Sequence, residues 1–104
     1  MVIIIWEYQV KAERTAEFEN IYSINGAWTE LFRKAMGYRG TELLRDPNHS
    51  QRYITIDRWA SSQDYESFLL QWKTEYAMLD MQCAGLTEKE SLLGKWESLL
   101  AETR

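Results

Sequence analysis

The length and composition of the chain limit what kind of protein it can be. Its 104 residues are enough for one domain, spanning residues 1–104, because a second domain would be too small to bury a core of its own. Hydrophobic residues make up 45% of the chain and charged residues 27%, which is typical of globular proteins. The formal net charge of −4 argues against nucleic acid as a partner, since phosphates require a basic surface.

The apolar N-terminal run and the single cysteine bear on the location of the protein. Val2–Trp6 is apolar, but Glu7 follows at once, so the run is too short for a signal-peptide core or a membrane span. We therefore expect no membrane segment. Cys83 is the one cysteine, which excludes an internal disulfide, and we expect it to be a packed thiol. A free thiol fits a reducing compartment, so the sequence predicts a cytoplasmic protein.

The first third of the chain has the pattern of a strand followed by a helix. Val2–Val10 begins with β-branched residues and then alternates apolar with polar residues, which predicts a buried strand. After a polar connection, apolar residues recur at helical spacing from Thr15 to Ala35. Gly26 interrupts this pattern, so we expect one long helix that is broken or kinked there. Gly37 suits the end of that helix.

A β-hairpin and a second helix follow. Residues 38–46 and 51–59 have the pattern of strands, and Asp46–Ser50 supplies the turn residues between them. Ser61 or Ser62 is a candidate N-cap for the next helix, with Asp64 favourably placed in its first turn. Apolar side chains then share one face of this helix: Tyr65, Phe68, Leu69, Trp72, Tyr76 and Leu79.

The C-terminal region is expected to contain a short helix and a last strand. Thr87 and Glu90 have the spacing of a capping box, which predicts that a helix begins there. Gly94 is placed to end that helix, and Lys95–Leu100 is expected to form the final strand.

This order of elements predicts an α+β fold, a ferredoxin-like split β-α-β sandwich with a four-stranded antiparallel sheet and its helices on one face. We expect Val2, Ile4, Trp6 and Tyr8, which share one parity of the first strand, to form an apolar patch on the open face. Two open faces packed together would give a homodimer, a dimeric α+β barrel. A pocket is expected between sheet and helices, lined by the other strand parity and the second helix.

Known metal and cofactor motifs are absent from the sequence. The only histidine, His49, lies in the predicted turn beside Pro47, and Cys and His residues are not clustered, so we expect no metal site. Gly37 and Gly40 are not followed by a helix, so they do not form a phosphate-binding loop. There is no flavin, nicotinamide or nucleotide motif, and we expect no cofactor.

The most specific pattern runs from Gly37 to Phe68. It contains the two hairpin strands, a Trp that closes the second of them, two serines and the start of the capped helix. In its order of elements from Val2 to Trp96, the chain resembles the antibiotic biosynthesis monooxygenase family of dimeric α+β barrels. The resemblance implies a cofactor-independent monooxygenase that oxidises a small aromatic, quinol or polyketide-like substrate with molecular oxygen.

The polyketide-oxidising branch of that family suggests which residues act. Its members have an Asn, a Trp four residues later and a Tyr six residues after the Trp. Trp59 and Tyr65 match this spacing, Thr55 stands where the Asn would be, and the later Arg of that branch has no counterpart near Leu79. The resemblance implies that Trp59, Tyr65 and Thr55 orient the substrate and stabilise oxygen intermediates. Alternatively, Trp59 is a core residue and Tyr65 packs the first turn of the second helix.

Glu7 and three rings complete the predicted site. Glu7 is a carboxylate in an otherwise apolar strand, so it could accept a proton in the pocket, or pair with an Arg of a neighbouring strand such as Arg39 or Arg58. Rings of the second helix would line the substrate pocket or belong to the core: Phe68, Trp72 and Tyr76.

Other functions are weighed against the monooxygenase. The haem-degrading branch of the family needs an iron-ligating His on the second helix, near Met78 of this chain, and an Asn where Glu7 stands, so haem is disfavoured. A non-catalytic dimer that binds a small hydrophobic ligand would also explain the many rings. The same fold hosts isomerases, lyases and cyclases, because a fold does not determine a function.

Overall fold

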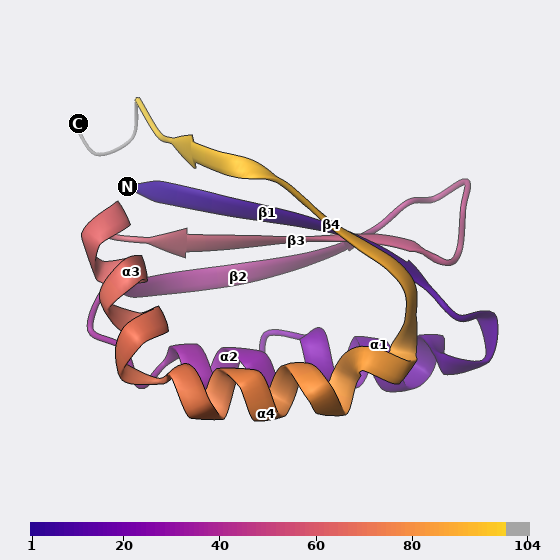
Figure 1. Ribbon diagram of the computed structural model, residues 1–104. Coiled ribbons are helices and arrows are strands. Elements are labelled where there is room, and N and C mark those ends of the chain that lie inside the picture. The colour runs from indigo at the N-terminus through magenta and orange to yellow at the C-terminus, as the bar shows by residue number, and fades with distance from the viewer. Residues whose placement is uncertain (100–104) are drawn as a thin grey trace.

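The computed structural model describes residues 1–99 and contains one antiparallel sheet of four strands. The strand order is β2-β3-β1-β4 (Figure 1). This is the ferredoxin-like α+β arrangement that the sequence predicts, because the central strands β1 and β3 are separated in the chain by a helical layer and the β2 strand. The strands are β1 (Val2–Val10), β2 (Tyr38–Arg45), β3 (Arg52–Trp59) and β4 (Thr87–Glu97).

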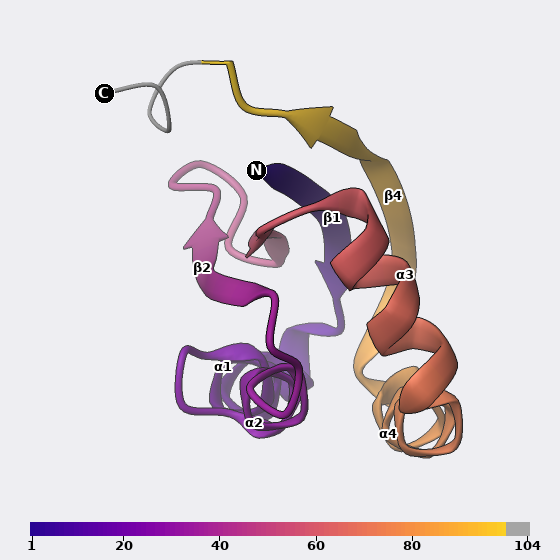
Figure 2. The ribbon, with the colours of Figure 1, turned by 90° about the vertical axis from the view of Figure 1, so that its left-hand side faces the viewer.

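The helices cover one face of the sheet (Figure 2). Four α-helices and two short 3-10 helices connect the strands: η1 (Ala12–Arg14), α1 (Thr15–Tyr22), α2 (Ala27–Phe32), α3 (Ser62–Gln71), α4 (Lys73–Cys83) and η2 (Ala84–Leu86). Among residues 1–99, no helix combines the length and apolar character needed to span a membrane.

The predicted break at Gly26 is confirmed, and it separates α1 from α2. A Cβ atom on Gly26 would lie 2.1 Å from the carbonyl oxygen of Ile21, so only glycine fits this close approach of two backbone segments. Thr29 holds the turn in place, since its hydroxyl donates to the carbonyl oxygens of Ile24 and Gly26, each at 3.0 Å.

The second predicted helix is capped as expected but is divided in two. The Ser61 hydroxyl accepts a hydrogen bond from the backbone N–H of Asp64 at 3.0 Å, which confirms the N-cap of α3. The backbone of Trp72 leaves the helical conformation between α3 and α4. This bend lets Phe68 of α3 contact Trp59 while Tyr76 of α4 contacts Trp28, with ring centroids 5.1 and 4.9 Å apart.

The prediction of a helix from Thr87 to Gly94 is wrong, because this segment belongs to the long strand β4. Tertiary pairing overrides the local capping signal here: β1 needs a partner on its second edge, and β4 supplies it along its whole length. Gly94 does not end a helix but lies next to a bulge in the register. Its φ of 153° is a conformation that favours glycine.

The predicted orientation of β1 is also wrong. Val2, Ile4 and Tyr8 are buried beneath the helices, whereas the side chains of Ile3 and Ile5 lie on the open face. Both parities of this strand are apolar, so alternation alone did not distinguish them. Packing against the helices determines which side of β1 is covered, since the Tyr8 ring packs edge-on against two rings of α1 with centroids 5.2 Å apart.

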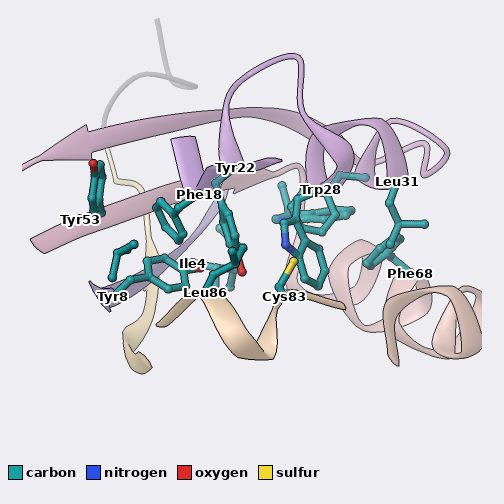
Figure 3. Close-up of a cluster of buried hydrophobic side chains, with 14 residues drawn as sticks. Ile4, Tyr8, Phe18, Tyr22, Trp28, Leu31, Tyr53, Phe68, Cys83 and Leu86 are labelled. Atoms are coloured by element: carbon teal, nitrogen blue, oxygen red, sulfur yellow. The ribbon is translucent and has the colours of Figure 1, made fainter. Parts of the chain in front are cut away.

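Aromatic rings dominate the core between the sheet and the helices. Tyr8, Phe18, Tyr22 and Trp28 form a continuous row, with the Phe18 and Tyr22 rings stacked at 4.1 Å (Figure 3). Cys83 is a buried free thiol beside Trp28. Large rings leave irregular spaces where they meet, and one such space is a cavity against the sheet.

Candidate functional site

A cavity of about 230 Å³ lies between the helix-facing side of the sheet and the helices α1, α2 and α4. All four strands contribute to its walls, so it spans the width of the sheet. Its apolar lining consists of six aromatic rings: Trp6, Tyr8, Tyr22, Trp28, Phe32 and Tyr76. A few polar groups in an aromatic cavity are the usual composition of a small-molecule site.

Asp57 is the most buried of the charged groups in this cavity. It stands on β3 and is only 7% exposed. The Thr41 hydroxyl of β2 donates a hydrogen bond of 2.6 Å to its Oδ1 atom. Burial raises the pKa of the Asp57 carboxyl to about 6, and the hydrogen bond from Thr41 limits that rise. A carboxyl group with such a pKa can accept and release a proton near neutral pH.

Thr41 links Asp57 to a second hydroxyl. The Tyr38 hydroxyl lies 2.5 Å from the Thr41 oxygen. Because Thr41 donates its own proton to Asp57, Tyr38 must be the donor in this bond. The chain of hydrogen bonds therefore runs from Tyr38, which is half-buried, through Thr41 to the carboxylate, and both hydroxyls donate in the direction of Asp57.

A second pair of hydroxyls lies on the adjacent strands. The Tyr8 hydroxyl of β1 and the Thr55 hydroxyl of β3 are 3.2 Å apart, and both residues line the cavity. Burial is the main reason why the pKa of the Tyr8 hydroxyl is raised, and the nearby charge of Asp57 adds a smaller increase. The phenol therefore stays protonated and can donate a hydrogen bond to an oxygen atom of a ligand.

Two of the predicted site residues line this cavity. Thr55 contributes its hydroxyl from β3 and Tyr76 its ring from α4. Trp59, Tyr65 and Phe68 do not line the cavity and form a cluster with Trp59 at its centre. The rings of Tyr65 and Phe68 are 5.4 and 5.1 Å from the Trp59 ring.

Trp59 and Trp72 are both placed away from the cavity. Trp59 is fully buried, and among residues 1–99 its Nε1 atom has no hydrogen-bond partner. Trp72 lies at the bend between α3 and α4, where the Lys34 ammonium group sits 5.0 Å from its ring centroid. The core alternative for Trp59 agrees with this placement, because a fully buried indole contributes mainly packing.

Glu7 lies on the opposite side of the sheet from the cavity. Its carboxylate pairs with Arg52 of β3, rather than with the Arg39 or Arg58 that the sequence suggested. Arg58 pairs instead with Glu42 at 2.6 Å. Strand register explains the difference, because Gln9, which shares the open face with Glu7, stands opposite Arg52.

Within the part of the chain that the structure describes, no group of His, Cys, Asp or Glu side chains could hold a metal ion. His49 is an exposed turn residue whose Nδ1 atom lies 3.2 Å from the carboxylate of Asp46.

Comparison with known proteins identifies the family. A family model described as antibiotic biosynthesis monooxygenase matches residues 1–71, which is more than half of the chain. The chain belongs to this family. None of the curated proteins matches its sequence.

Solved structures share the fold of this family member. A variant of SnoaB, a cofactor-independent oxygenase from Streptomyces nogalater, is 20% identical, with a TM-score of 0.78 over 96% of this chain and 94% of that one. A candidate antibiotic biosynthesis monooxygenase from Deinococcus radiodurans is 15% identical, with a TM-score of 0.75 over 97% of this chain and 95% of that one. A further candidate, from Nitrosomonas europaea, is 15% identical, with a TM-score of 0.74 over 95% and 99% of the two chains.

The three carboxylates that line the cavity of this family member were not predicted from its sequence: Asp57, Asp80 and Glu90. Asp57 shares the parity of Thr55 and Trp59 on β3, so the same face of the strand that drew attention to those two residues also carries a carboxylate. Strand parity could therefore have pointed to Asp57 from the sequence. Asp80 and Glu90 are separated from Asp57 along the chain, and only the pairing of β4 with β1 brings Glu90 to the cavity.

Proposed function

We propose that this protein is a cofactor-independent monooxygenase that acts on a small, electron-rich aromatic substrate such as a quinol. The observation that carries this proposal is a buried carboxyl group, Asp57, with a pKa of about 6 in the wall of an aromatic cavity. The cavity volume of about 230 Å³ falls below the roughly 300–1,000 Å³ of typical drug-sized sites, which favours a substrate with one ring. Family membership supports the oxygenase class.

In the proposed reaction, Asp57 accepts the proton of an ionising carbon acid or phenol. The resulting anion reduces molecular oxygen, and a C–O bond forms to give a peroxide on the substrate. Cleavage of its O–O bond with loss of water leaves a carbonyl group, so one oxygen atom enters the product and the other leaves as water. The protein contributes a base, a site from which water is partly excluded and hydrogen-bond donors for the developing oxyanion.

The predicted site residues take different roles in this proposal. Thr55 and Tyr76 contact the substrate from the cavity wall, and Tyr8 joins Thr55 as a hydroxyl donor. Trp59, Tyr65, Phe68 and Trp72 do not line the cavity, so in this proposal they act through packing. Glu7 does not act as a proton acceptor in this proposal, because its carboxylate is paired with Arg52 on the open face.

We also propose that the protein is a homodimer through the open face of its sheet. Four isoleucines, Ile3, Ile5, Ile54 and Ile56, lie half-buried at the centre of this face and are called the isoleucine patch below. Ion pairs flank the patch, Glu7 with Arg52 and Glu42 with Arg58. An apolar centre with a charged rim is the usual composition of an interface between identical subunits. The cytoplasmic location and the single domain over residues 1–104 stay predictions.

Oxygen consumption by the purified protein tests the oxygenase. Dihydroquinones and single-ring phenols are supplied one at a time, and the rate is compared with that of buffer. We expect uptake that Asp57→Asn lowers by about 100-fold or more, because loss of a general base typically costs 10²–10⁴ in rate. Glu75→Gln is the control, since Glu75 is exposed on α4 and does not line the cavity. Binding of these compounds without oxygen uptake would instead support the non-catalytic binding module.

A further inference from the structure

The charges of the cavity are all of one sign. Asp57 from β3, Asp80 from α4 and Glu90 from β4 line it, and among the described residues no Lys or Arg does. Asp57 is buried at the sheet, while Asp80 and Glu90 are exposed and form the mouth. A ligand that enters therefore passes two carboxylates and meets a third at the inner wall.

These three carboxylates pair with no cation in the part of the chain that the structure describes. On the rest of the surface, carboxylates are commonly paired, as Glu7 and Asp46 are with Arg52, and Glu66 is with Lys95. Within residues 1–99, no ion pair joins Asp57, Asp80 or Glu90 to a basic side chain. The negative charge of the cavity is thus left for a ligand to neutralise.

The three groups act on the same space. Glu90 is exposed but still partly shielded from water by its neighbours, and this partial burial, followed by the charge of Asp80, raises its pKa. Burial is also the main reason why the pKa of Tyr76 is raised, and the charges of Asp80, Asp57 and Glu90 all add to it. Tyr76 therefore lies in the combined field of all three. Among the described residues these carboxylates do not form a group that could hold a metal ion, and the charge of an organic cation is complementary to theirs.

The rings of the cavity suit the same kind of ligand. Trp6, Trp28 and Tyr76 contribute aromatic surface to the cavity that Asp57, Asp80 and Glu90 also line. An organic ammonium group is attracted to the faces of such rings as well as to carboxylates, whereas an anionic group is repelled by both.

We propose that this cavity selects single-ring arylalkylamines, with the ring among the aromatic side chains and the protonated or quaternary nitrogen directed toward Asp80 and Glu90. This selection deepens the proposed function, on which it rests for the choice of an aromatic substrate. In a phenol that carries an aminoalkyl chain, the hydroxyl group would then face the inner wall, where Asp57, Thr55 and Tyr8 lie.

Three phenols of similar size and different charge test this selection. Tyramine is a cation at pH 7.5, 4-ethylphenol is neutral and 4-hydroxyphenylacetate is an anion. In isothermal titration calorimetry we expect tyramine to bind about fivefold more tightly than 4-ethylphenol, and the anion to bind most weakly, because exposed charge pairs have modest strength. The preference for tyramine should shrink in 0.5 M salt, since the charges at the mouth are open to screening.

Variants at the mouth separate charge from shape. In the double variant Asp80→Asn with Glu90→Gln, tyramine should bind about as weakly as 4-ethylphenol does, while the affinity for 4-ethylphenol stays within about twofold. Glu75→Gln, which removes a charge from α4 outside the cavity, should leave the preference intact. Circular dichroism confirms that the variants are folded.

The comparison of the three ligands would overturn the selection if tyramine and 4-ethylphenol bound equally well, if 4-hydroxyphenylacetate bound more tightly than tyramine, or if none of them bound. A tyramine preference that survives in the double variant would also overturn it. Oxygen uptake is measured separately on the same compounds. Uptake without a preference for the amine would refute the selection and leave the oxygenase standing. A preference for the amine without oxygen uptake on any substrate would refute the oxygenase and leave the selection standing.

Discussion

Asp57 is held by the fold in an environment that opposes its charge. It lies on the helix-facing side of β3, is 7% exposed and has Thr41 as its hydrogen-bond donor. Burial raises the pKa of its carboxyl to about 6 from an ordinary value of 3.8, so the folded state favours the protonated form. The resulting stabilisation is fully present below the unfolded pKa and is lost as the pH rises through about 6.

Asp57→Asn should remove this dependence of stability on pH. At pH 8 we expect the variant to be more stable than the unaltered protein by about 1–3 kcal/mol, because an amide replaces a buried charge. At pH 4.5, where the carboxyl is protonated in the folded protein but mostly ionised in the unfolded chain, the difference should be clearly smaller than at pH 8. Urea unfolding followed by tryptophan fluorescence at both pH values measures the difference. An equal difference at pH 4.5 and pH 8 would contradict the raised pKa.

At the scale of elements, glycines mark the places where strands and helices change direction. Gly26 allows the backbone at the start of α2 to approach the end of α1, which turns one predicted helix into two. Gly94 permits the bulge of β4 at a φ of 153°. Both positions affect the cavity, because α1, α2 and β4 each contribute to its lining.

Gly26→Ala should therefore destabilise the protein. A Cβ atom there would lie 2.1 Å from the Ile21 carbonyl oxygen and 2.6 Å from that of Asn20, so the backbone would have to move. We expect a loss of about 1–3 kcal/mol in the free energy of unfolding, as in other overpacked sites. Gly85→Ala is a matched control: its nearest neighbour is the Arg14 guanidinium at 4.0 Å, so its effect should stay near zero. Equal losses in both variants would show that packing at Gly26 is not the cause.

At the scale of the whole molecule, the two faces of one sheet serve different purposes. The helix-facing side carries the aromatic core and the cavity. Figure 2 shows the helices gathered on that one side of the sheet. The open side carries the isoleucine patch, with exposed Leu93 and Trp96 of β4 along its edge. Half-buried isoleucines on an uncovered sheet favour association with a second sheet.

Ile54→Glu should dissociate the proposed dimer without unfolding the subunit. The side chain of Ile54 lies on the open face, so the charge would enter the interface and not the core. We expect sedimentation velocity to show a dimer for the unaltered protein and a monomer for this variant. Leu70→Glu is the control, because Leu70 is 79% exposed on α3 and the substitution adds the same charge there. A monomer at micromolar concentration before any substitution would refute the dimer.

Features that depend on neighbouring residues could be predicted from the sequence. The strands β1, β2 and β3, the turn between the last two, the Ser61 cap and the break at Gly26 all follow from local alternation, side-chain caps and backbone freedom. The ferredoxin-like order could be derived from them. Thr55 was a candidate through the family resemblance and Tyr76 through the helical stripe, and both line the cavity, while their roles stay predictions.

The remaining features were decided by tertiary contacts. β4 is a strand because the second edge of β1 needs a partner, and β1 turns Tyr8 toward the helices because rings of α1 bury it there. Glu7 faces away from the cavity for the same reason. The charge of the cavity joins Asp57, Asp80 and Glu90 across more than thirty positions of the chain. Local pattern determines which faces of an element are apolar, whereas packing determines which of those faces is covered and which polar groups meet beneath it.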